Sequence, residues 1–164
     1  ELTGLKVGIV GLGTTGQLIA KTLQVMGSDL YYYSRTRKPE EEAKGIRYLP
    51  LNELLPKVDV VFGCLNKNVI LFHEEEFKLL GNGKIMFNTS IGPSHDSKAL
   101  EDWLSHGDNE FFCDTEAAAG APELLSNPHV NCVGASSGGR TAQAFERLSE
   151  KVLENIEAFF NLKG

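Results

Sequence analysis

A glycine-rich turn between a predicted strand and a predicted helix is the feature that most restricts how this chain can fold. The motif Gly11-Leu12-Gly13-Thr14-Thr15-Gly16 follows the apolar run 5–10 and precedes an amphipathic stretch over 14–26. In this context Gly11 permits the tight turn, Gly13 lacks the Cβ that would block a pyrophosphate, and Gly16 lets the helix pack close to the strand. The free N–H groups at the helix start would face the phosphates. The motif therefore predicts a phosphate-binding turn, and the alternative is a glycine-rich turn without a ligand.

The rest of the chain alternates short apolar runs with amphipathic stretches. The apolar runs 5–10, 30–33, 46–49, 58–64, 84–88, 110–113 and 130–133 predict strands, and the stretches 14–26, 51–55, 72–80, 97–106 and 141–160 predict helices. Such alternation is typical of a parallel sheet that helices cover on both faces. We therefore predict an α/β fold, a Rossmann-type doubly wound parallel sheet of about seven strands, formed by one dinucleotide-binding domain over 1–164.

Three of the predicted helices carry apolar residues at helical spacing. These residues are Leu18, Ile19, Thr22, Leu23 and Met26 in the first helix, Ala99, Leu100, Trp103 and Leu104 in the helix over 97–106, and Phe145, Leu148, Val152, Ile156 and Phe159 in the last helix. The spacing predicts one apolar face per helix, and the face over 97–106 is expected to point inward.

The end of the second predicted strand bears on the choice of dinucleotide. Proteins that bind NAD usually place Asp or Glu about 20 residues after the glycine motif, where it holds the ribose 2′-hydroxyl. Here the segment reads Tyr33-Ser34-Arg35-Thr36-Arg37-Lys38, with no acid until Glu40, and the run 40–42 resembles a solvated helix start. Hydroxyls and guanidinium groups suit a 2′-phosphate. The segment favours NADP, and a solvated basic loop that tolerates either cofactor is the alternative.

Composition excludes several other classes of function. The net charge of −6 disfavours nucleic acid and anionic membranes as partners, and no apolar run is long enough to span a membrane. The three cysteines are odd in number and form no Cys-x-x-Cys pair, which disfavours a metal site or disulfide framework and favours a reducing, cytoplasmic compartment. The chain begins at Glu1 rather than Met, which favours a piece cut from a longer polypeptide.

Taken together, the motifs resemble the nucleotide-binding domain of the D-2-hydroxyacid dehydrogenase family, nearest its glyoxylate and hydroxypyruvate reductase branch. The segments that carry the resemblance are Leu2-Thr3-Gly4-Leu5-Lys6-Val7-Gly8-Ile9-Val10-Gly11-Leu12-Gly13, Tyr32-Tyr33-Ser34-Arg35-Thr36-Arg37-Lys38, Leu51-Asn52-Glu53-Leu54-Leu55, Asn88-Thr89-Ser90 and Cys113-Asp114-Thr115. The resemblance implies a missing substrate domain, an active site in the cleft between the two domains, and a homodimer.

The resemblance also implies roles for single residues. Cys64 and Leu65 match a strand end over the adenosine, Thr89 and Ser90 match a segment beside the nicotinamide, and Asp114 matches an acid near its carboxamide. With the residues inferred from the motifs, the predicted cofactor site is Gly11, Gly13, Thr14, Thr15, Gly16, Ser34, Arg35, Thr36, Cys64, Leu65, Thr89, Ser90 and Asp114.

The family's catalytic residues do not carry over to this chain. Ile91 stands where the family has an Arg that grips the substrate carboxylate, Ala117 stands where it has a Glu, and the segment 134–138 lacks its His. Among possible substitutes, Arg140 and Glu116 lie near the expected cleft, His95 is expected to be a solvated first-turn histidine, and Ser136 and Ser137 have no visible base.

These observations leave three hypotheses about function. The first is an NADP(H)-binding domain of an oxidoreductase that transfers hydride to or from a small carbonyl or hydroxy compound, with NAD as a possible cofactor. We expect this chain alone to be inactive, and turnover of glyoxylate or hydroxypyruvate by the isolated chain would contradict that. The second is a catalytically silent dinucleotide-binding sensor or interaction module. The third is a Rossmann domain for another nucleotide.

Overall fold

The computed structural model describes residues 1–134 and 138–161. The chain divides into two compact units, Glu1–Gly134 and Ala135–Gly164. The first unit contains the sheet, and the second contains one long helix. Within the described residues, no helix combines the length and apolarity needed to cross a membrane.

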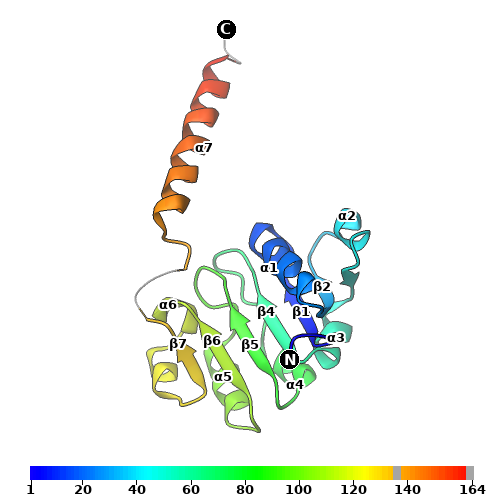
Figure 1. Cartoon of the computed structure of the whole chain (residues 1–164). Coiled ribbons are helices and arrows are strands. Elements are labelled where there is room, and N and C mark those ends of the chain that lie inside the picture. The colour runs from blue at the N-terminus through cyan, green and yellow to red at the C-terminus, as the bar shows by residue number, and fades with distance from the viewer. Residues whose placement is uncertain (135–137, 162–164) are drawn as a thin grey trace. The chain divides into compact units, whose positions relative to one another are not determined.

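All seven strands of the first unit pair in parallel, in the order β3-β2-β1-β4-β5-β6-β7. The strands are β1 (Lys6–Val10), β2 (Asp29–Tyr33), β3 (Arg47–Tyr48), β4 (Val60–Gly63), β5 (Ile85–Asn88), β6 (Glu110–Cys113) and β7 (Val130–Cys132). From β1 the chain builds outward to β3, and it then returns to the other side of β1 to form β4 (Figure 1). The predicted doubly wound sheet is confirmed.

Helices follow the strands. They are α1 (Thr14–Val25), α2 (Pro39–Glu42), α3 (Leu51–Leu54), α4 (Glu74–Leu80), α5 (Ser97–Leu104), α6 (Glu116–Ala119) and α7 (Ala142–Asn161), with short 3-10 turns η1 (Leu55–Lys57) and η2 (Pro122–Ser126). The sequence patterns did not predict α6 and η2. Helix α4 begins at Glu74 rather than at 72, because Phe72 is fully buried and forms a parallel bridge to His95.

Two hydrophobic clusters form the core. Side chains alternate along a strand, so Val7 and Ile9 of β1 join one cluster while Val10 joins the other. The cluster around Val10 includes Phe77 of α4 and Leu100 of α5. Trp103 and Leu104 of α5 are also buried, which confirms the inward face predicted for that helix. The cluster around Ile9 includes Ala20 of α1, so helices cover both faces of the sheet.

Helix α1 is confirmed within one residue of its predicted bounds, and the residues of its predicted apolar face differ in burial. Leu18 and Met26 are 63% and 48% exposed, whereas Ile19 and Leu23 pack against the core beside the buried Ala20. The helix approaches the sheet through its small residues Gly16 and Ala20, and Leu18 points away from that contact. The apolar spacing thus identified the helix, and the small residues Gly16 and Ala20 mark the side that is buried.

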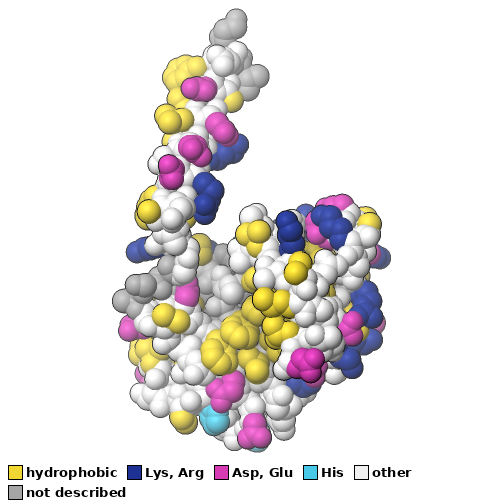
Figure 2. Space-filling view, in the orientation of Figure 1, with side chains coloured by type: hydrophobic (Ala, Val, Ile, Leu, Met, Phe, Trp, Pro, Cys, Tyr) yellow, Lys and Arg dark blue, Asp and Glu magenta, His cyan; other side chains and the backbone are white. Residues whose placement is uncertain are grey.

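Apolar surface remains exposed or half-buried at two places, on the strands β4 to β6 and on the last helix. Half-buried Phe62, Phe87 and Phe112 lie on adjacent strands, with ring centroids 4.7 and 4.8 Å apart in turn. Figure 2 shows hydrophobic side chains gathered over β4 and β5. Helix α7 is confirmed at nearly its predicted bounds, but none of its residues is buried.

Candidate functional site

The turn between β1 and α1 has the backbone geometry that its three glycines suggest. Gly11 has φ of 101°, and a Cβ there would lie 2.4 Å from the carbonyl oxygen of Cys64. A Cβ on Gly16 would lie 2.3 Å from the Gly11 carbonyl oxygen. A Cβ on Gly13, in contrast, would meet nothing within 4 Å. Two glycines are therefore required by the fold itself, while Gly13 borders open space.

The first backbone N–H groups of α1 have no side chain that caps them. Gly13 is the N-cap, so it has no side chain to accept a hydrogen bond from the first helical N–H groups, and the first turn of α1 contains no acidic residue. Helix N-termini carry partial positive charge and attract anions. The turn can thus bind an anion above Gly13.

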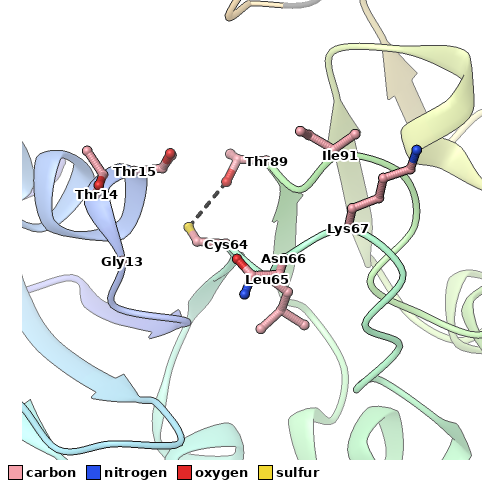
Figure 3. A pocket seen from close by; sticks show the side chains of 9 residues that line it. All are labelled: Gly13, Thr14, Thr15, Cys64, Leu65, Asn66, Lys67, Thr89 and Ile91. Atoms are coloured by element: carbon pink, nitrogen blue, oxygen red, sulfur yellow. Dashed lines mark hydrogen bonds between the residues drawn. The ribbon is translucent and has the colours of Figure 1, made fainter. Parts of the chain in front are cut away.

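A pocket of about 300 Å³ opens beside this turn, at the carboxyl ends of β1, β4 and β5. Its lining residues are Gly13, Thr14, Thr15, Cys64, Leu65, Asn66, Lys67, Thr89 and Ile91 (Figure 3). Six of these belong to the predicted cofactor site, so the structure brings together residues from three separate segments. Asn66 and Lys67 were missed, because the short loop after β4 matches no motif.

The hydroxyl of Thr89 ties two of these strand ends together. Thr89 Oγ1 lies 3.2 Å from the Cys64 sulfur and donates to the carbonyl oxygen of Gly63 at 3.1 Å. Burial raises the pKa of the Cys64 thiol, and the hydrogen bond with Thr89 opposes this only in part. Cys64 is accordingly a protonated packing residue in the pocket wall rather than a thiolate nucleophile.

Ser90 and Asn88 lie beneath the pocket rather than in its lining. The Leu65 N–H donates to Ser90 Oγ at 2.9 Å, and the Ser90 N–H donates to Asn88 Oδ1 at 3.1 Å. The buried Asn88 amide also donates to the carbonyl oxygens of Gly92 and Ala118, each at 2.9 Å. These bonds fix the loop after β5 against both β4 and α6.

The basic segment after β2 is held by a small network of its own. Arg37 forms an ion pair with Glu42, and its guanidinium carbon lies 4.8 Å from the centre of the Tyr48 ring. The Tyr32 hydroxyl donates to Glu42 at 2.8 Å and accepts from the Lys38 N–H at 2.7 Å. Hydrogen bonding to Arg37 is the main cause that lowers the pKa of Glu42. Arg37 is thus committed to the fold of this loop.

Ser34, Arg35 and Thr36 precede this network, with Ser34 half-buried and the next two residues exposed. The Ser34 hydroxyl donates to the Thr36 carbonyl oxygen, which folds the segment back on itself. Arg35 is exposed and has no ion pair with any of the described residues. The expectation that 40–42 is wholly solvated was wrong, since Glu41 is only 9% exposed and pairs with Lys44 at 2.7 Å.

Asp114 is half-buried directly after β6, next to the start of α6. Thr115 caps that helix through its side chain, which accepts from the Ala118 N–H at 3.3 Å. Cys113 is paired in register with Cys132 on β7, and burial together with this neighbouring thiol raises its pKa to about 12. All three cysteines are free, as expected.

The solvated state expected for His95 was wrong. Its side chain is 1% exposed, its ring lies edge-on to Phe111 at 5.0 Å, and its Nε2 lies 2.9 Å from the Ala119 carbonyl oxygen. That carbonyl can only accept, so Nε2 carries the proton. Burial lowers the pKa of His95. A neutral, buried histidine of this kind holds α6 in place and is not a surface proton donor.

Two of the three positions where the family's catalytic residues are replaced lie in the first unit, and Glu116 lies beside one of them. Ile91 is 74% exposed in the pocket lining, whereas Glu116 and Ala117 are exposed on α6 and do not line the pocket. Arg140 is exposed in the second unit, while Ser136 and Ser137 lie outside the described residues. No group of three metal-ligating side chains occurs in the part of the chain that the structure describes.

Comparisons with known proteins bear on this pocket. The profile of the family described as "D-isomer specific 2-hydroxyacid dehydrogenase, NAD binding domain" matches residues 1–132. The chain is similar to the glyoxylate reductase of Pyrococcus furiosus, with 31% identity over 97% of the chain and 49% of that protein. It is also similar to the glyoxylate reductase of Thermococcus litoralis, with 33% identity over 96% of the chain and 50% of that protein.

Solved structures extend the same likeness. A glyoxylate reductase from Paecilomyes thermophila has a TM-score of 0.80 and 26% identity, over 96% of this chain and 49% of that one. The D-lactate dehydrogenase of Aquifex aeolicus, complexed with NAD and lactic acid, has a TM-score of 0.81, covering 98% of this chain and 55% of that one; at 22% identity it shows the fold alone. The chain spans about half the length of the curated relatives it matches. The chain therefore belongs to the D-isomer specific 2-hydroxyacid dehydrogenase family and contains that family's NAD-binding domain.

Proposed function

We propose that this chain binds NADP(H) in the pocket beside the β1–α1 turn, as the cofactor domain of an enzyme that interconverts a 2-oxo acid and a 2-hydroxy acid. The observation that carries the proposal is the open space above Gly13, bordered by uncapped N–H groups of α1 and by the pocket. A dinucleotide pyrophosphate is the anion that such a turn accepts. The bound nicotinamide supplies the hydride.

Each remaining part of the cofactor has residues that suit it. We assign the pyrophosphate to the turn of Gly11, Gly13, Thr14, Thr15 and Gly16, the adenosine end to Ser34, Arg35, Thr36, Cys64 and Leu65, and the nicotinamide end to Thr89, Ser90 and Asp114. The Ser90 hydroxyl oxygen accepts a hydrogen bond from the Leu65 N–H at 2.9 Å. We therefore assign Ser90 the role of positioning Leu65 rather than of contacting the cofactor.

The preference for NADP(H) over NAD(H) depends on Arg35. Arg37 is already paired with Glu42, whereas Arg35 is exposed beside two hydroxyl-bearing residues. A guanidinium can hold phosphate oxygens through two parallel hydrogen bonds, which the ribose 2′-hydroxyl of NAD cannot exploit. We assign recognition of the 2′-phosphate to Arg35.

We further propose that the protein works in a reducing compartment such as the cytoplasm and as a homodimer. The three free cysteines support the first statement, since Cys113 and Cys132 face each other in register as thiols. Membership of the family supports the second, because its members commonly pair through this domain.

A calorimetric titration of the chain with NADPH and, separately, NADH tests the cofactor assignment. We expect NADPH to bind at least tenfold more tightly than NADH. Equal affinities would refute the assignment of Arg35 while leaving dinucleotide binding intact. No binding of either dinucleotide would refute the proposed function as a whole.

A further inference from the structure

One basic side chain, Lys67, lines the pocket that we assign to the cofactor. Nine residues line this pocket, and Lys67 is the only one among them with a formal charge. The other lining groups are hydroxyls, a thiol, an amide, two aliphatic side chains and a glycine. Any negatively charged molecule that enters the pocket therefore meets a single ionic partner among these lining residues.

Lys67 lies at the end of the pocket away from the phosphate turn. Figure 3 shows Thr14 and Thr15 at one side of the pocket, and Lys67 with Ile91 at the other, with the lysine nitrogen farther from the two threonines than Ile91 is. The pyrophosphate is assigned to the first side. The ammonium group of Lys67 is thus placed where a molecule beside the cofactor, rather than the phosphates, would meet it.

A tight turn fixes the backbone that carries this lysine. The Val69 N–H donates to the Asn66 carbonyl oxygen at 3.2 Å, so Lys67 and Asn68 are the two central residues of a four-residue turn. Asn68 has φ of 66°, a left-handed conformation that Asn adopts more readily than most residues. The lysine therefore extends from a defined turn and not from an unstructured loop.

The charge on Lys67 is not neutralised within the described parts of the chain. The ion pairs of the described residues involve other lysines, arginines and His129, and no carboxylate lines the pocket. Ile91, on the same side of the pocket as Lys67, is 74% exposed and offers no charge of its own. Lys67 is itself exposed, so a carboxylate can reach its ammonium group and form a charge-assisted hydrogen bond with it.

We propose that Lys67 binds the carboxylate of the substrate. The inference rests on the proposed function, because 2-oxo and 2-hydroxy acids are anions at neutral pH and would lie beside the nicotinamide. It adds a substrate-binding residue from the cofactor domain itself, in the loop after β4. The neighbouring Ile91 then provides an apolar surface against the carbon chain of the acid.

The experiment uses the protein saturated with NADP⁺, the oxidised cofactor, which has no hydride to transfer to glyoxylate. Binding of glyoxylate, and of the uncharged analogue glycolaldehyde, is measured by nuclear magnetic resonance titration. The variants are Lys67→Met, Lys67→Arg and, as a matched control, Lys98→Met, which removes an exposed lysine of α5 outside the pocket. The affinity for NADPH is measured in parallel for each.

We expect Lys67→Met to weaken glyoxylate binding at least tenfold, while glycolaldehyde and NADPH binding change less than twofold. Lys67→Arg should retain most of the glyoxylate affinity, and Lys98→Met should match the unaltered protein. An unchanged glyoxylate affinity in Lys67→Met would overturn the inference, as would an equal loss of NADPH affinity, which would make Lys67 a ligand of the cofactor phosphates. An unaltered protein that binds NADPH but not glyoxylate would overturn it and leave the cofactor assignment standing, whereas failure to bind NADPH would overturn both.

Discussion

The carboxylate of Glu42 holds Arg37 in an ion pair at the foot of the loop that follows β2. The same carboxylate accepts a hydrogen bond from Tyr32 at 2.8 Å, so this arginine is part of the loop's internal structure. Two residues earlier, Arg35 has no such partner among the described residues. The two arginines of this basic segment therefore have different roles.

Replacement of the two arginines by alanine separates these tasks. We expect Arg35→Ala to weaken NADPH binding about 10- to 100-fold, the loss of one charge-assisted interaction of about 1.5–3 kcal/mol, while NADH binding stays within twofold. Arg37→Ala should lower the melting temperature and weaken both dinucleotides alike, because it disturbs the loop. The measurement is calorimetric titration of each variant, and a larger NADPH-specific loss in Arg37→Ala would contradict the assignment.

The glycines of the β1–α1 turn predict a second pair of contrasting variants. Gly13→Ala places a methyl group in open space, so the fold should persist while dinucleotide binding falls at least tenfold. Gly16→Ala places it 2.3 Å from the Gly11 carbonyl oxygen, which should destabilise the protein by about 1–3 kcal/mol through overpacking. Urea denaturation and titration with NADPH measure both effects. Full NADPH affinity in a folded Gly13→Ala variant would disprove the proposed position of the pyrophosphate.

His95 predicts a pH dependence of stability. Because burial lowers its pKa in the folded protein, the unfolded chain binds a proton below about pH 6.5 that the folded chain does not. The stabilisation is therefore complete above that value and is lost as the pH falls from 6.5 through the lower folded-state pKa. One such group contributes at most about 1.4 kcal/mol per pH unit.

Comparison with His95→Gln isolates this contribution. The glutamine amide can still donate to the Ala119 carbonyl oxygen, but it does not titrate. We expect the difference in free energy of unfolding between the two proteins to shrink as the pH is lowered from 7 to 5, as measured by urea denaturation. A difference that stays constant over this range would show that His95 does not titrate as its burial implies.

Cys64 is expected to react slowly with alkylating reagents. Burial raises the pKa of its thiol, so little thiolate is present at pH 7. Iodoacetamide labelling followed by mass spectrometry should be slower than in urea-unfolded chain, should still accelerate above pH 9, and should slow further when NADPH fills the pocket. If Cys64 of the folded protein were labelled near pH 7 as fast as in the unfolded chain, the predicted protection of this thiol would be wrong.

The sheet and the backbone of the glycine-rich turn were predictable because their signals are local. The strand 110–113 has its predicted bounds, and the close approaches at Gly11 and Gly16 occur within six consecutive residues. The surroundings of His95 were not predictable, since its burial depends on Phe111 and on the Ala119 carbonyl, which distant segments supply.

The pocket was predicted in part. Cys64, Leu65 and Thr89 were assigned to the site through the resemblance to the family, and the carboxyl edge of the parallel sheet brings them together. Lys67 escaped prediction because its place depends on a four-residue turn that no sequence motif marks. Helix α6 was missed because four residues give no periodicity, and it is fixed instead by Thr115 and by the remote Asn88.

The order of the strands creates a hollow that does not depend on the side chains around it. Because β1 continues toward β2 and β4 continues toward β5, the segments that leave these neighbouring strands diverge whatever side chains they carry. The hollow between these segments thus depends on the course of the main chain and on the glycines of the β1–α1 turn. Side chains around such a hollow can therefore be exchanged while the hollow itself is kept.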